Sequence, residues 1–207
     1  MVTKVLNKNV NVPKMNVNEL YVTARVTRDL IPTQRGDAYM LKFCIVGTKR
    51  RKRDIYITAI ASPKVTENIK DVKAGDTVRL RLAIKTNFMR SYDSHRLNQI
   101  YSYFVRNIWM DDKMTKSNQG RLTGRITELH IGRTSGNITI MSNKHRDTKT
   151  ILTINRKSAL NDLRNFKAND WVDVDYSLHA QIAKGASVPY KRVATVDHVN
   201  NGVIVEK

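Results

Sequence analysis

The sequence predicts an all-β protein with short helices, built as two related five-stranded barrels in tandem. The hexapeptide VTARVT at residues 22–27 returns as LTGRIT at residues 122–127. A second landmark, KAGDTV at residues 73–78, returns as KANDWV at residues 167–172. The two landmarks lie 51 residues apart in the first copy and 45 in the second, as expected for one fold with loops of different length. Apolar and polar residues alternate along much of both copies, which is the period of half-buried β-strands.

Length and charge restrict the class of protein. A chain of 207 residues can form two units of about 100, each large enough for a hydrophobic core without disulfides or metal. It carries 37 Lys and Arg against 18 Asp and Glu, and the net charge of +19 predicts a polyanionic partner, most commonly nucleic acid. We expect a cytoplasmic protein with no membrane partner. No apolar run reaches about 18 residues, and residues 1–17 lack the apolar centre of a secretory signal.

The first half of the chain is predicted to be mostly strands. Alternation is clearest at residues 78–85, where Val78, Leu80, Leu82 and Ile84 face one side of the strand. A short helix is expected at residues 64–72, because apolar residues recur there at helical spacing after Pro63. The other expected elements are a basic arm at residues 1–17, strands at 20–27, 38–46, 54–61 and 100–109, loops at 29–37, 47–53 and 86–98, and a linker at 111–119.

The second half repeats this order of elements. Strands are expected at residues 120–129, 137–141, 150–154, 171–180 and 192–199, with a helix around 158–166. Five strands with a helix between the third and fourth is the order of the OB-fold barrel. We therefore expect one OB-fold domain at residues 18–110, holding the main nucleic-acid site, and a second at residues 120–207.

Three segments of the first half together resemble a known family. They are the opening NELYVTARV at residues 18–26, the step KAGDTV at residues 73–78, and the aromatic strand at residues 100–109. In this order they resemble the bacterial and phage single-stranded DNA-binding proteins and the related primosomal replication protein. The resemblance implies a protein that is bacterial, or encoded by a phage or plasmid in a bacterial host. The resemblance covers most of residues 18–110 and, more weakly, residues 120–200.

This resemblance implies a binding face on strands two and three, with bases stacked on aromatic rings. The flanking loops, including the one between strands four and five, would complete the site. Stacking on a ring is tolerant of sequence, because every base has a π-face. The candidate rings in the strands and in the loop at residues 86–98 are Tyr39, Phe43, Tyr56, Phe88 and Tyr92.

Clustered cations are the candidate phosphate contacts. The densest basic run stands between two expected strands, and its five adjacent charges repel one another unless an anion neutralises them. The run consists of Lys49, Arg50, Arg51, Lys52 and Arg53. Further candidates are Arg79, Arg81, Arg90 and Arg96 in the first half, and Arg133, Lys144 and Arg146 in the second.

The two halves differ in charge. Residues 1–116 carry 23 Lys and Arg against 10 Asp and Glu, whereas residues 117–207 carry 14 against 8. Aligning the fourth strands places Arg79 and Arg81 of the first copy with Asp173 and Asp175 of the second. We therefore expect the first copy to dominate nucleic-acid binding. The second copy either extends the site or uses an exposed acidic strand to meet a protein, including a second copy of this chain.

Catalysis has no support in the sequence. The five histidines are scattered, no Cys-x-x-Cys or His-x-x-x-His spacing occurs, and no glycine-rich phosphate cradle appears. The single cysteine, Cys44, lies in the apolar run 40–46, where packing is its expected role. We expect no catalytic residues, no metal and no cofactor.

The predicted function is non-catalytic, largely sequence-independent binding of single-stranded DNA in replication, recombination or DNA transfer. One alternative is an RNA-binding OB-fold protein, because stacking rings and phosphate contacts serve either polymer. Another is a replication or conjugation accessory whose barrels mainly dock other proteins. Self-association and binding of replication proteins stay open as partner interactions.

Overall fold

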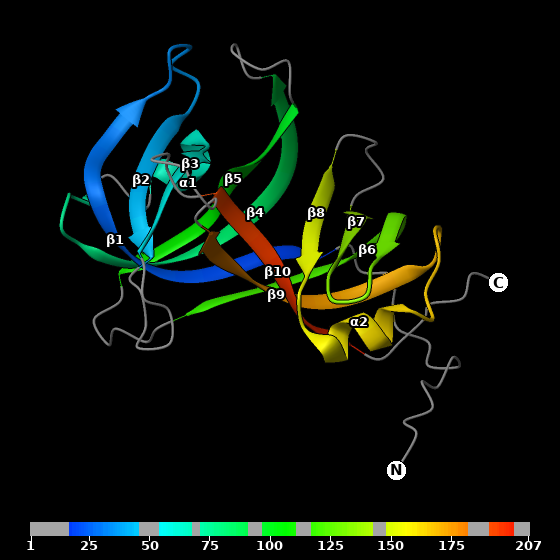
Figure 1. Ribbon diagram of the computed structural model, residues 1–207. Coiled ribbons are helices and arrows are strands. Elements are labelled where there is room, and N and C mark those ends of the chain that lie inside the picture. The colour runs from blue at the N-terminus through cyan, green and yellow to red at the C-terminus, as the bar shows by residue number, and fades with distance from the viewer. Residues whose placement is uncertain are drawn as a thin grey trace. The chain divides into compact units, whose positions relative to one another are not determined.

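A computed structural model describes residues 17–45, 54–67, 71–90, 97–110, 117–142, 148–181 and 191–200 (Figure 1). The described residues are predominantly β-strand with two short helices. They group into two compact units. One comprises the described residues of Glu19–Gln119 and Leu178–Arg192, and the other comprises residues 17–18, the described residues of Gly120–Ser177, and residues 193–200. Strands β1 to β5 are called the first barrel below, and strands β6 to β10 the second barrel.

The first barrel is a closed ring of five strands. Strand β1 pairs with both β2 and β4, β2 pairs with β3, and β5 joins β3 to β4. The β3–β5 pairing is parallel and the others are antiparallel. Its elements are β1 (Asn18–Pro32), β2 (Tyr39–Ile45), β3 (Ile55–Ala61), α1 (Pro63–Thr66), β4 (Thr77–Arg90) and β5 (Leu97–Met110).

The second barrel repeats the same pairing. Strand β6 pairs with β7 and β9, β7 pairs antiparallel with β8, and β10 lies between β8 and β9, which closes the ring. Helix α2 buries Ala159, Leu160 and Leu163. The elements are β6 (Asn118–Ile131), β7 (Gly136–Met141), β8 (Lys149–Ile154), α2 (Lys157–Leu163), β9 (Trp171–Gln181) and β10 (Lys191–Asn200). Both copies thus have the expected strand order, with a helix between the third and fourth strands.

The alternation predicted for the fourth strand is confirmed. Val78, Leu80, Leu82 and Ile84 are each at most 1% exposed, so one face of β4 lines the core of the first barrel. Strand β3 shows the same period of two, with every second residue buried from Ile55 onward. In both strands the residues between these buried positions face outward, apart from Ala83, which is buried.

The two sequence landmarks make identical hydrogen bonds in the two barrels. The Val26 N–H donates to the Asp76 carbonyl at 2.8 Å, and the Ile126 N–H donates to the Asp170 carbonyl at 2.8 Å. The turn before each aspartate needs a positive φ, which Gly75 provides at 99° and Asn169 at 76°. Glycine adopts this region freely and asparagine is among the few other residues that tolerate it. The sequence repeat is therefore a structural repeat.

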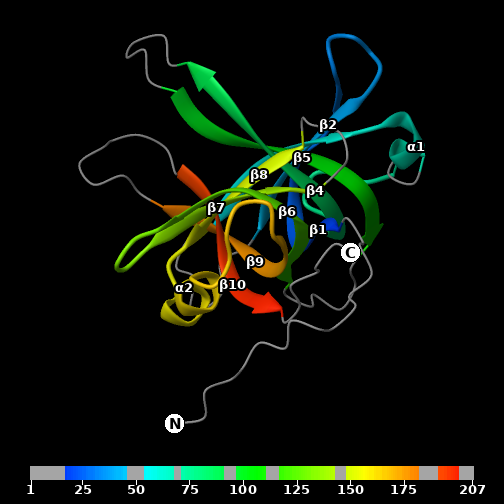
Figure 2. The ribbon, with the colours of Figure 1, turned by 90° about the vertical axis from the view of Figure 1, so that its right-hand side faces the viewer.

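Some strand ends were predicted wrongly. The loop expected at residues 29–37 is shorter, because β1 continues to Pro32 and pairs there with Tyr39. The stretch expected as a loop at residues 86–98 contains the ends of β4 and β5, which form a two-stranded ribbon extending from the barrel (Figures 1 and 2). Both faces of this ribbon are polar in part, so alternation could not reveal it. Helix α1 covers only Pro63–Thr66 of the described residues.

One pair of core positions is filled differently in the two barrels. In the first barrel Leu20 on β1 lies opposite Leu82 on β4, and both are fully buried. At the matching place in the second barrel Gly120 on β6 lies opposite Tyr176 on β9, and Tyr176 is fully buried. A methyl group added at Gly120 would overlap the Tyr176 ring. A small residue beside a large one thus fills the space that two leucines fill in the first barrel.

Candidate nucleic-acid interface

The outward face of β2 and β3 carries an exposed aromatic ring. Cys44 lies opposite Tyr56, and Lys42 lies opposite Thr58. Residues directly opposite each other in an antiparallel pair share a face. Tyr56 is 54% exposed, whereas Ile57 beside it in sequence is 2% exposed and points into the core. The Tyr56 ring is therefore presented on the surface of the first barrel, where a base could stack.

Cations of neighbouring strands border this ring. On β1, Arg25 lies opposite Cys44 and Arg28 lies opposite Lys42, so both arginines share the face of Tyr56. Both arginines are exposed, and Lys42 is half-buried. We call Arg25, Arg28, Lys42 and Tyr56 the Tyr56 face. Its arrangement of one ring among three cations can hold a base and its flanking phosphates together.

Sequence reasoning did not identify these three cations. Arg25, Arg28 and Lys42 are isolated in the sequence and belong to no run of charge. For Arg25 and Lys42 a usable signal existed, since each interrupts an apolar alternation and so belongs to the outward side of its strand. Which cations share one face with Tyr56 depends on the pairing of β1, β2 and β3, which the sequence does not display.

Cys44 sits beneath this face and is buried, which confirms its predicted packing role. Burial, together with the nearby Asp54 carboxylate, raises the pKa of the Cys44 thiol from 9.0 to about 11. The thiol is therefore neutral near pH 7 and is a poor nucleophile.

Two predicted stacking residues on β2 point the other way. The prediction for Phe43 is wrong, because its ring is fully buried and belongs to the core. Tyr39 has the same inward parity, lies at the start of β2 opposite Ala61, and is half-buried. On β5, Tyr101 and Tyr103 are also in the core, at 8% and 1% exposure. Aromatic residues in strands fill barrels as readily as they face solvent, and composition cannot separate the two cases.

The β4–β5 ribbon exposes a second ring. Phe88 is 57% exposed and Met89 is 58% exposed, and Phe88 lies opposite Gln99. Phe88 was expected in a loop but lies in β4, so its backbone is held by cross-strand hydrogen bonds. Arg90 is the last residue of β4. Tyr92 and Arg96 fall outside the described residues, and they stay predictions.

The two arginines predicted on β4 have different surroundings. Arg79 is exposed. Arg81 forms an ion pair with Glu19, and the Tyr21 hydroxyl donates a hydrogen bond to the same carboxylate at 2.9 Å. Burial of the hydroxyl, and then its bond to Glu19, raise the pKa of Tyr21. Because Glu19 neutralises Arg81, Arg79 is the better candidate of the two for a phosphate contact.

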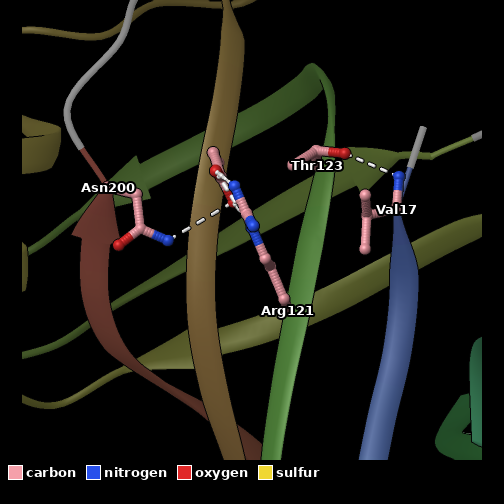
Figure 3. Close-up of polar contacts among 5 residues, drawn as sticks. Val17, Arg121, Thr123 and Asn200 are labelled. Carbon is pink, nitrogen blue, oxygen red and sulfur yellow. Dashed lines mark hydrogen bonds and ion pairs between the residues drawn. The ribbon is translucent and has the colours of Figure 1, made fainter. Parts of the chain in front are cut away.

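The exposure expected for the acidic strand of the second barrel is wrong for Asp173, which is buried, while Asp175 is half-buried. The alignment itself is correct, since Arg79 lies opposite Thr23 and Asp173 lies opposite Thr123 in the matching strands. Asp173, however, is only 7% exposed, and the Arg121 guanidinium binds its carboxylate through Nε at 3.0 Å and Nη2 at 2.6 Å (Figure 3). The Asn200 amide donates a further, longer bond to the same carboxylate at 3.4 Å. The charge of Asp173 is thus neutralised inside its own barrel.

The matching face of the second barrel is poorer in rings and charge. Arg125 lies opposite Met141, which lies opposite Lys149, so Lys149 occupies the place of Tyr56. Glu128 stands where the first barrel has Arg28. Arg133 is exposed in the turn between β6 and β7, and the Gly132 N–H closes that turn on the Ser135 carbonyl. Lys144 and Arg146 lie outside the described residues.

The basic run also lies outside the described residues. Lys49, Arg50, Arg51, Lys52 and Arg53 belong to the segment that connects Ile45 to Ile55, and these two residues pair at the ends of β2 and β3. The run therefore leads directly into the strand that carries Tyr56. Its role as a phosphate contact stays a prediction.

Two further observations concern the part of the chain that is described. There, no group of three or more His, Cys, Asp or Glu could hold a metal ion. Neither helix in these ranges is long and apolar enough to cross a membrane.

The fold is similar to that of a protein of known function. The wild-type single-stranded DNA-binding protein from Thermus aquaticus matches 89% of this chain and 92% of its own, with a TM-score of 0.61 and 12% identity. A deletion variant of that protein matches 89% of this chain and 94% of its own, with a TM-score of 0.62 and 12% identity. No protein-family model and no curated protein matches the sequence. A match over 89% of the chain must include both barrels, so the tandem OB-fold is shared with the Thermus aquaticus protein.

Proposed function

We propose that this protein binds single-stranded DNA without catalysis and largely without regard to sequence. The observation that carries the proposal is the Tyr56 face, where a ring at 54% exposure is bordered by Arg25, Arg28 and Lys42. An unpaired base can stack on a ring that is this exposed on the outside of a closed barrel. The bordering cations supply the attraction for phosphates.

The form of the site favours single strands over duplex. Stacking on Tyr56 needs a base that is free of its complement, and each stacked base contributes roughly 1–3 kcal/mol. Contacts to phosphate carry no sequence information, so the combination is tolerant of sequence. The chemistry described at the Tyr56 face includes no group that must read a particular base.

The shared fold supports the same conclusion, since the Thermus aquaticus protein is named as a single-stranded DNA-binding protein. Replication, recombination and DNA transfer are the processes in which such binding is used, and we propose this protein for that group. The first barrel is proposed as the main site, because Lys149 replaces Tyr56 and Glu128 replaces Arg28 in the second.

Fluorescence anisotropy with labelled oligo-dT, oligo-U and duplex DNA of equal length, at one salt concentration, tests the proposal. We expect oligo-dT to bind more tightly than duplex. Equal affinity for both would contradict stacking, and tighter binding of oligo-U would favour the RNA-binding alternative.

A variant of the ring itself makes the test specific. Tyr56→Ala is expected to weaken oligo-dT binding by about 5- to 150-fold, the equivalent of roughly 1–3 kcal/mol, whereas Tyr56→Phe retains binding. Thr58→Ala is the matched control, since Thr58 is exposed on the same side of β3 and offers no ring. If Tyr56→Ala binds no worse than Thr58→Ala, the Tyr56 face is not the site.

A further inference from the structure

A second exposed ring lies on the outer side of the first barrel. Trp109 on β5 lies opposite Arg79 on β4, and Arg79 lies opposite Thr23 on β1. The next pair along, Leu80 opposite Ile108, is buried at 0% and 5% exposure, so Trp109 and Arg79 face outward. Trp109 is 42% exposed, an unusual position for the largest apolar side chain unless something covers it.

The register of β1 connects this ring to the Tyr56 face. Arg25 lies opposite Cys44 on β2 and also opposite Thr77 on β4. Because Thr23 and Arg25 are two residues apart on one strand, they share its outward side. An outward path therefore runs from Tyr56 across Arg25 to Arg79 and Trp109. It crosses four strand spacings, from β3 through β2, β1 and β4 to β5, which is roughly 19 Å.

The composition of this path matches a polyanion with unpaired bases. It begins and ends with an exposed ring, and between the rings it carries two exposed arginines, Arg25 and Arg79, besides the buried Cys44. Cross-strand neighbours such as Arg79 and Trp109 stand about 4.5–5.5 Å apart at Cβ, so a phosphate and an adjoining base can be contacted together. A site of this extent lies within the span of about 4–16 nucleotides that one OB-fold covers.

We propose that Trp109 stacks a base of the same single strand that binds the Tyr56 face, with Arg79 contacting the adjoining phosphate. The inference rests on the proposed function and extends it from one face of the barrel to the outer side of β1, β4 and β5. The strand thus passes partly around the first barrel and is not confined to β2 and β3.

Intrinsic fluorescence gives a direct test, because the chain has only two tryptophans, Trp109 and Trp171. In the full-length Trp171→Phe protein, Trp109 is the only remaining tryptophan. We expect saturating oligo-dT to quench its emission. In the Trp109→Phe protein the remaining tryptophan is Trp171, which is half-buried, and we expect little change. Anisotropy on the same samples establishes that the oligonucleotide is bound.

Affinity provides the second measurement and does not depend on the folding of the Trp171 variant. Trp109→Ala is expected to weaken binding of oligo-dT by about 5- to 150-fold, while Trp109→Phe keeps a ring and retains most of the affinity. Met110→Ala is the matched control, because Met110 is the adjoining residue, is 57% exposed and cannot stack a base in the same way. Circular dichroism verifies that each variant is folded.

The outcomes separate the two proposals. If oligo-dT saturates the protein but leaves Trp109 emission unchanged, or if Trp109→Ala binds as well as Met110→Ala, the Trp109 inference is overturned while the proposed function stands. If the wild-type protein does not bind oligo-dT at all, the proposed function fails and the inference fails with it.

Discussion

Gly120 provides the sharpest stability test in this protein, because its missing side chain makes room for a buried ring. The Tyr176 ring lies against Gly120, is fully buried and so cannot swing into solvent. In Gly120→Ala the new methyl group must displace either the ring or the β6 backbone. Overpacking of this kind costs about 1–3 kcal/mol.

That cost translates into a measurable change in melting temperature. For a protein of 150–250 residues, 1 kcal/mol corresponds to about 2–4 °C, so Gly120→Ala should lower the Tm by about 2–12 °C. Thermal unfolding followed by circular dichroism or calorimetry measures the change. A Tm equal to that of the wild type would refute the packing argument.

The first barrel suggests the compensating change. Its matching positions hold Leu20 and Leu82, so the double variant Gly120→Leu with Tyr176→Leu would place the first barrel's pair in the second. We expect the double variant to be more stable than the sum of the two single effects predicts, with a coupling of about 0.5–3 kcal/mol. Strict additivity of the two single changes would show that these residues do not share one space.

Two further substitutions test the proposed binding surface, and one chemical test examines the burial of Cys44. Replacing the run from Lys49 to Arg53 by serine should weaken binding to all sequences alike and reduce the slope of log K against log salt by about 0.7 for each phosphate that the run neutralises, and an unchanged slope would mean that the run does not meet the backbone. Lys149→Tyr places a ring at the Tyr56 position of the second barrel and should raise the affinity for oligo-dT above that of a Lys149→Ala control, since stacking is worth roughly 1–3 kcal/mol per base. Cys44, with a pKa of about 11, should resist thiol reagents at pH 8 in the native protein and react once it is unfolded. Because the pKa of the Cys44 thiol is raised in the folded protein, the thiol contributes to stability below pH 9.0, and this contribution is lost as the pH rises towards 11. A thiol that reacts at once in the native protein would contradict the burial of Cys44.

The core of each barrel and the repeat could be predicted from the sequence, because both depend on local residue patterns. A strand with one buried face shows a period of two, and β3 and β4 of the first barrel have that pattern over most of their length. The turn before β4 needs a positive φ, and Gly75 and Asn169 are residue types that allow one. Such local requirements restrict residue types at fixed positions, and so they recur in both copies.

The candidate binding surface depends on information that is not local. Phe43 and Tyr56 are both aromatic residues of strands, and only the pairing of β2 with β3 and the closure of the barrel make one of them core and the other surface. The sequence predicts an exposed charge at Asp173, but in the structure the Asp173 carboxylate binds Arg121, which is 52 residues away in the chain. A charge count records how many cations a segment has, but it does not record which are already neutralised.

From the sequence alone we could predict the all-β class, the tandem repeat, the order of the elements and the basic character of the protein. These follow from periodicity, from backbone requirements at turns and from total charge, each of which acts over a few residues or over the whole composition. Which rings reach the surface and which cations border them depends on the folded structure, because cross-strand register places Arg25 on the face of Tyr56 and Arg79 opposite Trp109. Register is set by packing of the barrel core and by turn geometry acting together, so a functional surface of this kind emerges only when the chain is folded.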